Sequence, residues 1–418
     1  MGSSKGKIIW ITVSLLIVIL LAILFNLTGE FGYSSYRANY SHVYFSEHNP
    51  LAGAWNATTS YPLSVYFQMC ATYNGYIYCV GGLNSSLYSV NSVYYSKIGQ
   101  NGSLSGWHNA SAYPIPVAGE NCEAFNYTIY CLSGYISTPT SMNYTNTVYS
   151  AKINPNGSLS SWKKLNNYPV KSGGQSCVLA GRNIYCIGGI NSSSTAADIV
   201  FRSEIFSNGS ISGWHKAFDY PINISAPMCV PYNTSIECIT GFDSGLVPVA
   251  LNYYGSLSSN GSISGWHPTL DFPIAISGQS CVPYSDYIYC VGGVSSSQYY
   301  YSVYYSTVSQ TGQLGIWNNA YSYPSGILTP TCTSYGSHIY CIGGALNVSS
   351  NEFTPDVYYA DALPSGGLSA VSLNPLLFFL HNYFYPVIAL AEAAVLGAYI
   401  VLDIVRRRKI RKQRAGVK

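Results

Sequence analysis

Short apolar runs recur along the middle of the chain, and Gly, Asn, Ser or Pro bounds each of them. Such runs, with turn residues between them, are typical of β-strands. One unit has a first strand at 176–179, a turn at 180–183 and a second strand at 184–187. A third strand is predicted around 200–202, and a fourth strand is predicted to end at Trp214. This part of the chain is therefore predicted to be all-β.

The four-strand unit occurs six times, with a period of about fifty residues. Each unit contains two cysteines nine positions apart, and each is accompanied by a tryptophan: Trp55, Trp107, Trp162, Trp214, Trp266 and Trp317. Four of these tryptophans end the phrase Asn-Gly-Ser-x-Ser-x-Trp, which begins at Asn101, Asn156, Asn208 and Asn260. Asn-Gly between β-rich runs predicts a two-residue turn with positive φ at both positions, so the third and fourth strands should form a hairpin. A period near fifty indicates a propeller or a solenoid.

Glycine doublets follow the second strand in four units: Gly81-Gly82, Gly188-Gly189, Gly292-Gly293 and Gly343-Gly344. The apolar run, the doublet, the aromatic strand and the tryptophan together resemble the kelch repeat of β-propellers, of the type in the central domain of galactose oxidase. Units two and four depart from it with Ser133-Gly134 and Thr240-Gly241, and the repeated cysteines are also outside the usual pattern. The resemblance covers residues 41–361 and implies a six-bladed propeller.

The order of the motifs predicts how the propeller closes. The sixth unit lacks a tryptophan after Cys341, whereas Trp55 stands before the first cysteine. An N-terminal strand is therefore expected to complete the last blade, which removes an exposed edge. Residues 43–45 and 357–359 both resemble the third strand, and the last blade needs only one of them.

The cysteine spacing predicts disulfides inside hairpins. With a two-residue turn at Asn74 and Gly75, Cys70 faces Cys79 in a non-hydrogen-bonded pair with Cα atoms ~4.5 Å apart. Metal binding and thiol redox chemistry are the alternatives, but both use thiolates two to four residues apart, often with histidine. The predicted bridges are Cys70–Cys79, Cys122–Cys131, Cys177–Cys186, Cys229–Cys238, Cys281–Cys290 and Cys332–Cys341.

Two apolar stretches, residues 8–25 and 387–405, are long enough to span a bilayer. No small-residue cleavage site follows the first, so an uncleaved signal anchor is predicted over a cleaved signal peptide. Residues 406–418 are rich in Arg and Lys, which favours a cytoplasmic tail. The predicted topology places the propeller outside the cell membrane and both ends in the cytoplasm, with a cytoplasmic segment at 1–7 and linkers at 26–40 and 362–386.

Glu392 lies inside the second apolar stretch, where an ionisable side chain is costly. One interpretation is a protonated carboxyl bonded to Thr12 or Ser14 of the first helix, or to a second copy of the chain. The other is a proton-linked function.

Only 8% of the 418 residues are charged, and 41 are tyrosines. Residues 28–374 hold more acidic than basic side chains, which argues against nucleic-acid binding. A surface so poor in charge resembles, in composition, that of surface proteins of acid-living archaea. It predicts a stability that depends little on pH.

Asn-x-Ser/Thr sequons are frequent, and four of them occupy the same turn in successive units. Turn tips of an outside domain can carry glycans without disturbing the packing. The alternative is that each asparagine serves only its turn. The candidate sites in the predicted propeller are Asn56, Asn84, Asn101, Asn109, Asn126, Asn143, Asn156, Asn191, Asn208, Asn223, Asn233, Asn260 and Asn347.

Two known kinds of enzymatic propeller need residues that are missing here. A copper radical oxidase needs a free cysteine linked to tyrosine, but every cysteine has a predicted partner. A sialidase needs three arginines around a carboxylate, and the outside region has only Arg37, Arg182 and Arg202. We therefore expect no enzymatic activity and no cofactor.

Two further groups of residues bear on chemistry. The histidines that follow the blade tryptophans are expected on outer strands, too far apart to bind a metal: His108, His215 and His267. Glu120 and Glu123 flank Cys122 as the one acid pair expected at the central channel, and neither has a partner base.

The leading hypothesis is a membrane-tethered recognition or adhesion module that binds a surface protein or glycan through its loops. Tyrosine-rich segments such as 299–301 suit such contacts because they are rigid and amphipathic. Two alternatives stay open: a structural part of a glycosylated coat that associates laterally with itself, and an unrecognised hydrolase or oxidase.

Overall fold

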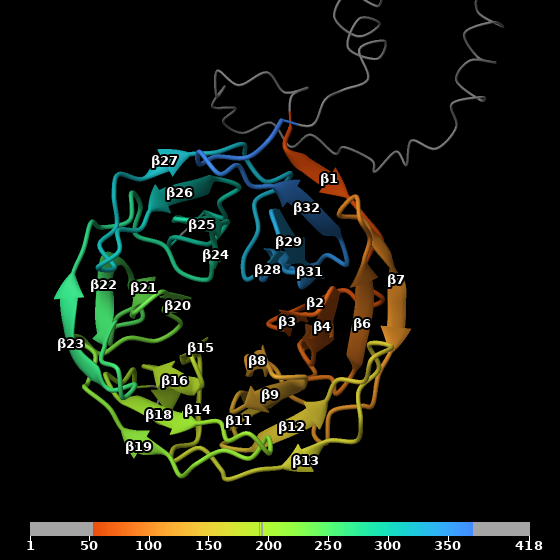
Figure 1. Cartoon of the computed structure of the whole chain (residues 1–418). Helices are drawn as coiled ribbons and strands as arrows, with labels where there is room; N and C mark the ends of the chain where they lie inside the picture. Colours follow the sequence, from red (N-terminus) through yellow and green to blue (C-terminus); the bar gives the residue numbers. More distant parts are fainter. Residues whose placement is uncertain (1–52, 192, 194, 297, 371–418) are drawn as a thin grey trace, which may run out of the picture. The chain divides into compact units, whose positions relative to one another are not determined.

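The computed structural model describes residues 53–191, 193, 195–296 and 298–370. They form a β-propeller of six four-stranded antiparallel sheets arranged around a central channel (Figure 1). The all-β class and the six blades are confirmed. In the described residues no helix is long and apolar enough to cross a bilayer. The predicted spans at 8–25 and 387–405, Glu392 and residues 41–52 lie outside the described part.

Each blade has strands a to d, named from the channel outward. Blades 1 to 3 contain β3 (Met69–Tyr73), β4 (Tyr76–Val80), β6 (Val93–Ile98), β7 (Leu104–Asn109); β8 (Asn121–Phe125), β9 (Thr128–Leu132), β12 (Val148–Lys152), β13 (Lys163–Lys164); and β15 (Ser176–Ala180), β16 (Asn183–Ile187), β18 (Val200–Glu204), β19 (His215–Lys216).

Blades 4 to 6 follow the same order. They contain β20 (Met228–Tyr232), β21 (Ser235–Phe242), β22 (Pro248–Leu257), β23 (Ile263–Pro268); β24 (Ser280–Tyr284), β25 (Tyr287–Val291), β26 (Val303–Thr307), β27 (Asn318–Asn319); and β28 (Thr331–Tyr335), β29 (His338–Ile342), β32 (Val357–Asp361), β1 (Trp55–Ala57).

The propeller has two different faces. The turns between strands a and b and between strands c and d lie on one face, here called the turn face. The longer b/c connections lie on the other, the loop face, where short strands form two-stranded ribbons. These ribbons pair β2 (Val65–Tyr66) with β5 (Leu83–Asn84), β10 (Tyr135–Thr138) with β11 (Ser141–Tyr144), β14 (Ser172–Gly173) with β17 (Ile190–Asn191), and β30 (Ala345–Asn347) with β31 (Glu352–Phe353).

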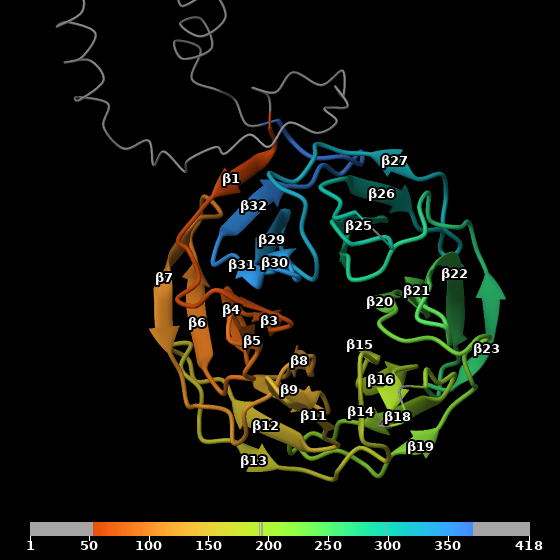
Figure 2. The same ribbon diagram turned by 180° about the vertical axis from the view of Figure 1, so that it is seen from behind.

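Blade 6 is closed by the N-terminal strand, as predicted. Trp55 in β1 pairs with Ala360 in β32, and the two strands lie side by side in both views (Figures 1 and 2). The third strand of this blade is β32, which resolves the choice between residues 43–45 and 357–359. Beyond β32 the chain turns back along the same blade. Ala362 forms a β-bridge with Leu368, and the Ser369 N–H donates to the Asp361 carbonyl at 2.7 Å. The outer strand is therefore shared by both ends of the described chain.

The apolar core lies between neighbouring blades, with one buried cluster at each of the six junctions. At every junction the blade tryptophan packs edge to face on a ring from the preceding connection, with centroids 4.8–5.0 Å apart. That ring precedes a proline in each repeat. The pairs are Trp107–Tyr61, Trp162–Tyr113, Trp214–Tyr168, Trp266–Tyr220, Trp317–Phe272 and Trp55–Tyr323.

The a/b hairpins have the predicted register, and the six predicted disulfides are present. In blade 1 the turn residues Asn74 and Gly75 both have positive φ, and Cys70 faces Cys79. The paired Cα atoms are 4.0–4.1 Å apart across the six bridges, slightly closer than expected. The described residues hold no free cysteine. Six such bridges indicate an extracellular or otherwise oxidising compartment.

The c/d hairpins exist, but their turns differ from the prediction. Gly102 has φ +83°, whereas Asn101 does not have positive φ. The Gly102 N–H donates to the Gly99 carbonyl and the Gly99 N–H to the Ser103 carbonyl, so the loop is a turn followed by a glycine bulge. The Asn101 side chain instead accepts bonds from Ser103. Strand d does not end at the tryptophan as predicted: in blade 3 β19 begins after Trp214, and in blade 1 β7 continues past Trp107.

The glycine doublets let two chain segments cross closely. In blade 1, a Cβ on Gly81 would stand 2.4 Å from the Val117 carbonyl oxygen, and the Gly82 N–H donates to that oxygen at 2.9 Å. In the two departing units Ser133 and Thr240 adopt the left-handed conformation. The fold tolerates these departures, as expected.

Candidate functional site

Two hollows are candidates for binding. One is the central channel, with a volume of about 350 Å³, which the innermost strands of all six blades line. The other, here called the outer hollow, has a volume of about 690 Å³ and opens on the turn face between blades 3 and 4. Their linings differ in chemistry.

The channel lining is mostly apolar, and Glu120 and Glu123 are its ionisable residues. The first cysteine of each disulfide lines it: Cys70, Cys122, Cys177, Cys229, Cys281 and Cys332. A belt of polar contacts joins neighbouring inner strands around it. Asn121, for example, donates to the Gln175 carbonyl and accepts from the Cys177 N–H, at 3.0 and 2.9 Å. These bonds hold the channel wall together, which leaves few free polar groups for a ligand.

Glu120 and Glu123 both border the channel, but they have different surroundings. The Glu120 side chain is fully buried, and its Oε1 lies 2.8 Å from where a Cβ on Gly81 would stand. Burial raises the pKa of Glu120 well above its usual range, while backbone N–H groups of Glu120 and Met69 oppose the shift. Glu123 is partly exposed, and burial raises its pKa to about 8. Glu120 and Glu123 are therefore two carboxyls in different surroundings.

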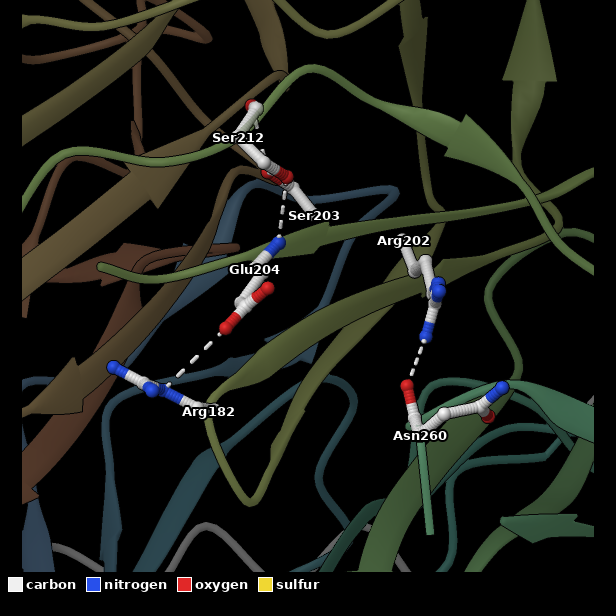
Figure 3. Close-up of polar contacts among 6 residues, drawn as sticks. All are labelled: Arg182, Arg202, Ser203, Glu204, Ser212 and Asn260. Atoms are coloured by element: carbon white, nitrogen blue, oxygen red, sulfur yellow. Dashed lines mark hydrogen bonds and ion pairs between the residues drawn. The ribbon is translucent and has the colours of Figure 1, made fainter. Parts of the chain in front are cut away.

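The outer hollow is polar and contains both arginines of the described residues. Arg182, in the a/b turn of blade 3, pairs with Glu204 on β18 at 3.7 Å, and both side chains are about half exposed (Figure 3). Arg202 on the same strand donates to the Asn260 carbonyl in the c/d turn of blade 4 at 3.0 Å (Figure 3). His215 and Asn233 complete the polar wall.

Hydrogen bonds to Ser212 hold the strand that carries Arg202 and Glu204. The Ser212 hydroxyl accepts the Glu204 N–H at 2.9 Å, and the Ser203 hydroxyl donates to the Ser212 carbonyl at 2.9 Å (Figure 3). The strand that carries Glu204 and Arg202 is thereby tied to its outer neighbour. Arg202 is only partly exposed, and its guanidinium also bonds the Tyr185 hydroxyl.

Arg202 also has a structural role. In blade 6 the equivalent residue, Tyr359, donates to the Asn101 carbonyl in the c/d turn of blade 1 at 3.2 Å. Arg202 makes the same contact to the next blade. Arg182 makes no such contact between blades, so it is the more informative residue for a binding test.

The structure separates the other sequence candidates. His108, His215 and His267 are exposed on β7, β19 and β23 of three different blades. Residues 53–370, apart from the three undescribed positions, contain no cluster of ligands that could hold a metal ion. The four sequon asparagines of the c/d turns are exposed, and their Oδ1 atoms accept from the serine two residues later: Asn101, Asn156, Asn208 and Asn260.

Sequence reasoning missed the ring partner of each tryptophan and the placement of two arginines around one hollow. The first had a signal, since Tyr-Pro or Phe-Pro recurs in every repeat. The second had none, because Arg182 lies in a turn and Arg202 on a later strand, and only Arg202 reaches Asn260, through the contact between blades.

Comparisons with known proteins reveal the fold. No protein-family model matches the chain, and no curated protein matches it. Among solved structures, the one described as "Structure of YjhT" matches with a TM-score of 0.61 and 13% identity, over 75% of this chain and 99% of that one. At this identity the likeness extends to architecture alone. The chain is thus a six-bladed β-propeller similar in fold to YjhT, a kelch-repeat protein.

Proposed function

We propose that this protein is a membrane-tethered recognition or adhesion module of the cell surface. Its propeller binds a surface protein or glycan, and the outer hollow is the main contact. The observation that carries the proposal is the placement of both arginines of the described chain around one open polar hollow.

The position of the chain ends supports a tether. Residues 53–57 and 368–370 share the outer strand of blade 6, so both ends leave from the rim of the propeller (Figure 1). The apolar stretches at 8–25 and 387–405 follow from these ends.

The chemistry of the hollow indicates what it recognises. Guanidinium groups bind carboxylates and other planar acids through two parallel hydrogen bonds. Arg182 is about half exposed and its Glu204 partner is 3.7 Å away, a long contact that a ligand carboxylate can displace. Serine hydroxyls and amides of the 258–261 turn line the rest of the hollow. We expect a ligand that presents an acid group beside hydroxyl or amide groups.

Binding of the full-length chain, purified in detergent, to arrays of surface glycans and peptides tests the proposal. We expect acidic ligands to bind, with Arg182→Gln weakening them about tenfold or more, because one charge-assisted pair is lost. Lys163→Gln on β13 is the matched control, since it removes an exposed positive charge from another blade. Equal loss with both variants, or no binding of acidic ligands, would contradict the proposal.

Glycans attached at the outer hollow would compete with the ligand for its space. The sequon residues Asn233 and Asn260 both line the outer hollow. Mass mapping of these two positions should therefore accompany the binding assay. We expect ligand binding to increase in any preparation in which they are unmodified.

A surface-coat role is the second candidate, and exposed apolar side chains on the outer edge favour it. Phe218, Leu270 and Ile316 are 57%, 46% and 76% exposed, and all three belong to the outer strands or connections of blades 3 to 5. Apolar groups there suit lateral contact between copies. Ordered arrays of the native protein on cells, lost in Ile316→Asp, would support this role.

A further inference from the structure

One tyrosine position forms a contact between neighbouring blades at four of the six blade junctions. It precedes the second cysteine of five disulfides, and in four of these blades its hydroxyl donates to a carbonyl in the c/d turn of the next blade, whereas the Tyr78 hydroxyl of blade 1 has no partner. The bonds are Tyr130 to Gly209 at 3.3 Å, Tyr185 to Gly261 at 2.5 Å, Tyr289 to Gly367 at 3.1 Å and Tyr340 to Gly102 at 2.8 Å. We call this residue the latch position.

Blade 4 has a carboxyl at the latch position. Glu237 is fully buried, and its Oε1 lies 2.8 Å from where a Cβ on Gly312 would stand, in the c/d turn of blade 5. The Ser235 hydroxyl donates to Oε1 at 2.7 Å, while Oε2 is buried without a partner. A carboxylate only accepts hydrogen bonds, whereas a protonated carboxyl has the O–H donor that the tyrosines use here.

A second position shows the same replacement at the channel. Two residues before the first cysteine, Gln68 donates to the Ile342 carbonyl of the preceding blade at 2.9 Å, and Gln279 to the Ile239 carbonyl at 3.5 Å. Glu120 takes this position in blade 2. It lies against Gly81, which follows Val80, the residue of blade 1 that is equivalent to Ile342. Both of its oxygens are buried and neither forms a hydrogen bond of normal geometry, although backbone N–H groups of Glu120 and Met69 face them. Here too only the protonated carboxyl supplies a donor like that of glutamine.

We propose that the carboxyls of Glu120 and Glu237, both called latches below, are protonated and join neighbouring blades. The propeller is then held closed at low pH. It loosens at the blade 1/2 and blade 4/5 junctions when these carboxyls lose their protons to solvent. The proposal goes beyond the proposed function and does not depend on it. It rests on two positions of the repeat: buried carboxyl oxygens stand at one where four other blades have a tyrosine donor, and at the other where two blades have a glutamine donor.

Among the described residues no cation faces either carboxyl, and only neutral donors oppose the effect of burial: the Ser235 hydroxyl at Glu237, and backbone N–H groups of Glu120 and Met69 at Glu120. Tyr220 and Tyr254, from the preceding connection and β22, lie beside Glu237, and Tyr232 bonds Asp286 in the neighbouring a/b turns. Tyr61, Tyr113 and Tyr135 surround Glu120. Burial raises the pKa of Glu237 to about 8, which the Ser235 hydroxyl opposes, and no cation contributes at either carboxyl.

The sign of the effect follows from the raised pKa. Unfolded glutamate loses its proton near pH 4.5, whereas folded Glu237 keeps it up to about pH 8. Between these values the folded state binds more protons, so its stability falls as pH rises. Each latch should lower the folding equilibrium constant by up to about tenfold per pH unit in this window. This is opposite to the usual salt-bridged carboxyl, and it differs from the pH-insensitive stability that composition alone predicts.

Unfolding of the full-length chain in detergent, with its disulfides intact, tests the proposal across pH 4.5 to 8. Wild type should be most stable at the acid end. Glu237→Gln and Glu120→Gln should each make the pH dependence less steep, and Glu352→Gln on exposed β31 should not change it. Infrared spectra at neutral pH should show the carbonyl stretch of protonated carboxyls, reduced in each latch variant.

Glu237→Tyr provides the second variant, because it restores the residue of the other five blades. It should remove the same part of the pH dependence and raise stability at neutral pH even if Glu237→Gln folds poorly. A wild-type slope retained in both Glu237 variants and in Glu120→Gln would overturn the proposal. The absence of a protonated carboxyl band at neutral pH would overturn it equally.

Discussion

The indole N–H of Trp55 donates to the Tyr321 carbonyl at 3.3 Å, across 266 residues of sequence. The same indole packs edge to face on Tyr323. Five other tryptophans make this contact within continuous chain, but here it joins the N-terminal strand to the connection that enters the last blade. The ring is therefore closed by a copy of its own repeating contact.

Trp55→Ala should destabilise the propeller by about 2–4 kcal/mol, since a large aromatic contact and a hydrogen bond are both lost from a half-buried site. It should also speed amide exchange in β1 and β32, because β1 has only β32 as a neighbour. Hydrogen exchange with mass spectrometry measures both strands.

Trp162→Ala is the control for closure. It removes the equivalent contact with Tyr113, 4.9 Å between centroids, but the chain on either side is continuous. We expect a similar loss of stability with no faster exchange in β1. Unchanged exchange of β1 in Trp55→Ala would show that the seam does not depend on this residue.

Removing one disulfide, as in Cys70→Ala with Cys79→Ala, should cost roughly 2–3 kcal/mol by the chain-entropy model for a ten-residue loop. The cost should be smaller if the Asn74-Gly75 turn already holds the hairpin in the denatured state. Denaturant unfolding under oxidising conditions measures it. Peptide mapping should recover links only between cysteines nine residues apart, and any link between blades would contradict the assigned pairing.

The number of blades, the closure and the disulfides were predictable because each depends on features that repeat in register. Cysteines nine apart around a two-residue turn must face each other, so Cys70 and Cys79 follow from spacing alone. Trp55, standing before the first pair, indicates a shared last blade. Turn geometry and the period of the repeat are therefore sufficient to predict the number of blades, the closure and the disulfides.

Contacts between blades were not predictable from one unit. The latch position shows a tyrosine in five repeats and Glu237 in the fourth, but only the structure shows what the hydroxyl bonds. The c/d turn was predicted wrongly for a related reason. The Asn101 side chain bonds Ser103, which stabilises a longer turn that Asn-Gly alone does not distinguish from a two-residue one.

The c/d-turn sequons allow the glycan and the turn interpretations to be separated. Asn101 uses Oδ1 in its turn, so its exposed Nδ2 remains open to glycosylation. Ser103→Ala should abolish any glycan at Asn101 and cost about 0.5–1 kcal/mol for the lost 2.7 Å hydroxyl bond. Ser103→Thr should preserve the glycan. Glycopeptide mass spectrometry of the native protein decides, and an unmodified Asn101 would favour the turn interpretation.

The latch position offers a matched pair of hydroxyl deletions. Tyr340 and Tyr78 are both fully buried, but the Tyr340 hydroxyl bonds Gly102 at 2.8 Å, whereas the Tyr78 hydroxyl is buried without a partner. Tyr340→Phe should therefore lose about 1 kcal/mol or slightly more, because the Gly102 carbonyl loses its donor. Tyr78→Phe should be neutral or stabilising, since it removes an unsatisfied polar group. Thermal unfolding of the two variants at one pH gives the comparison, and equal losses would mean that the hydroxyl bonds between blades contribute little to holding the ring together.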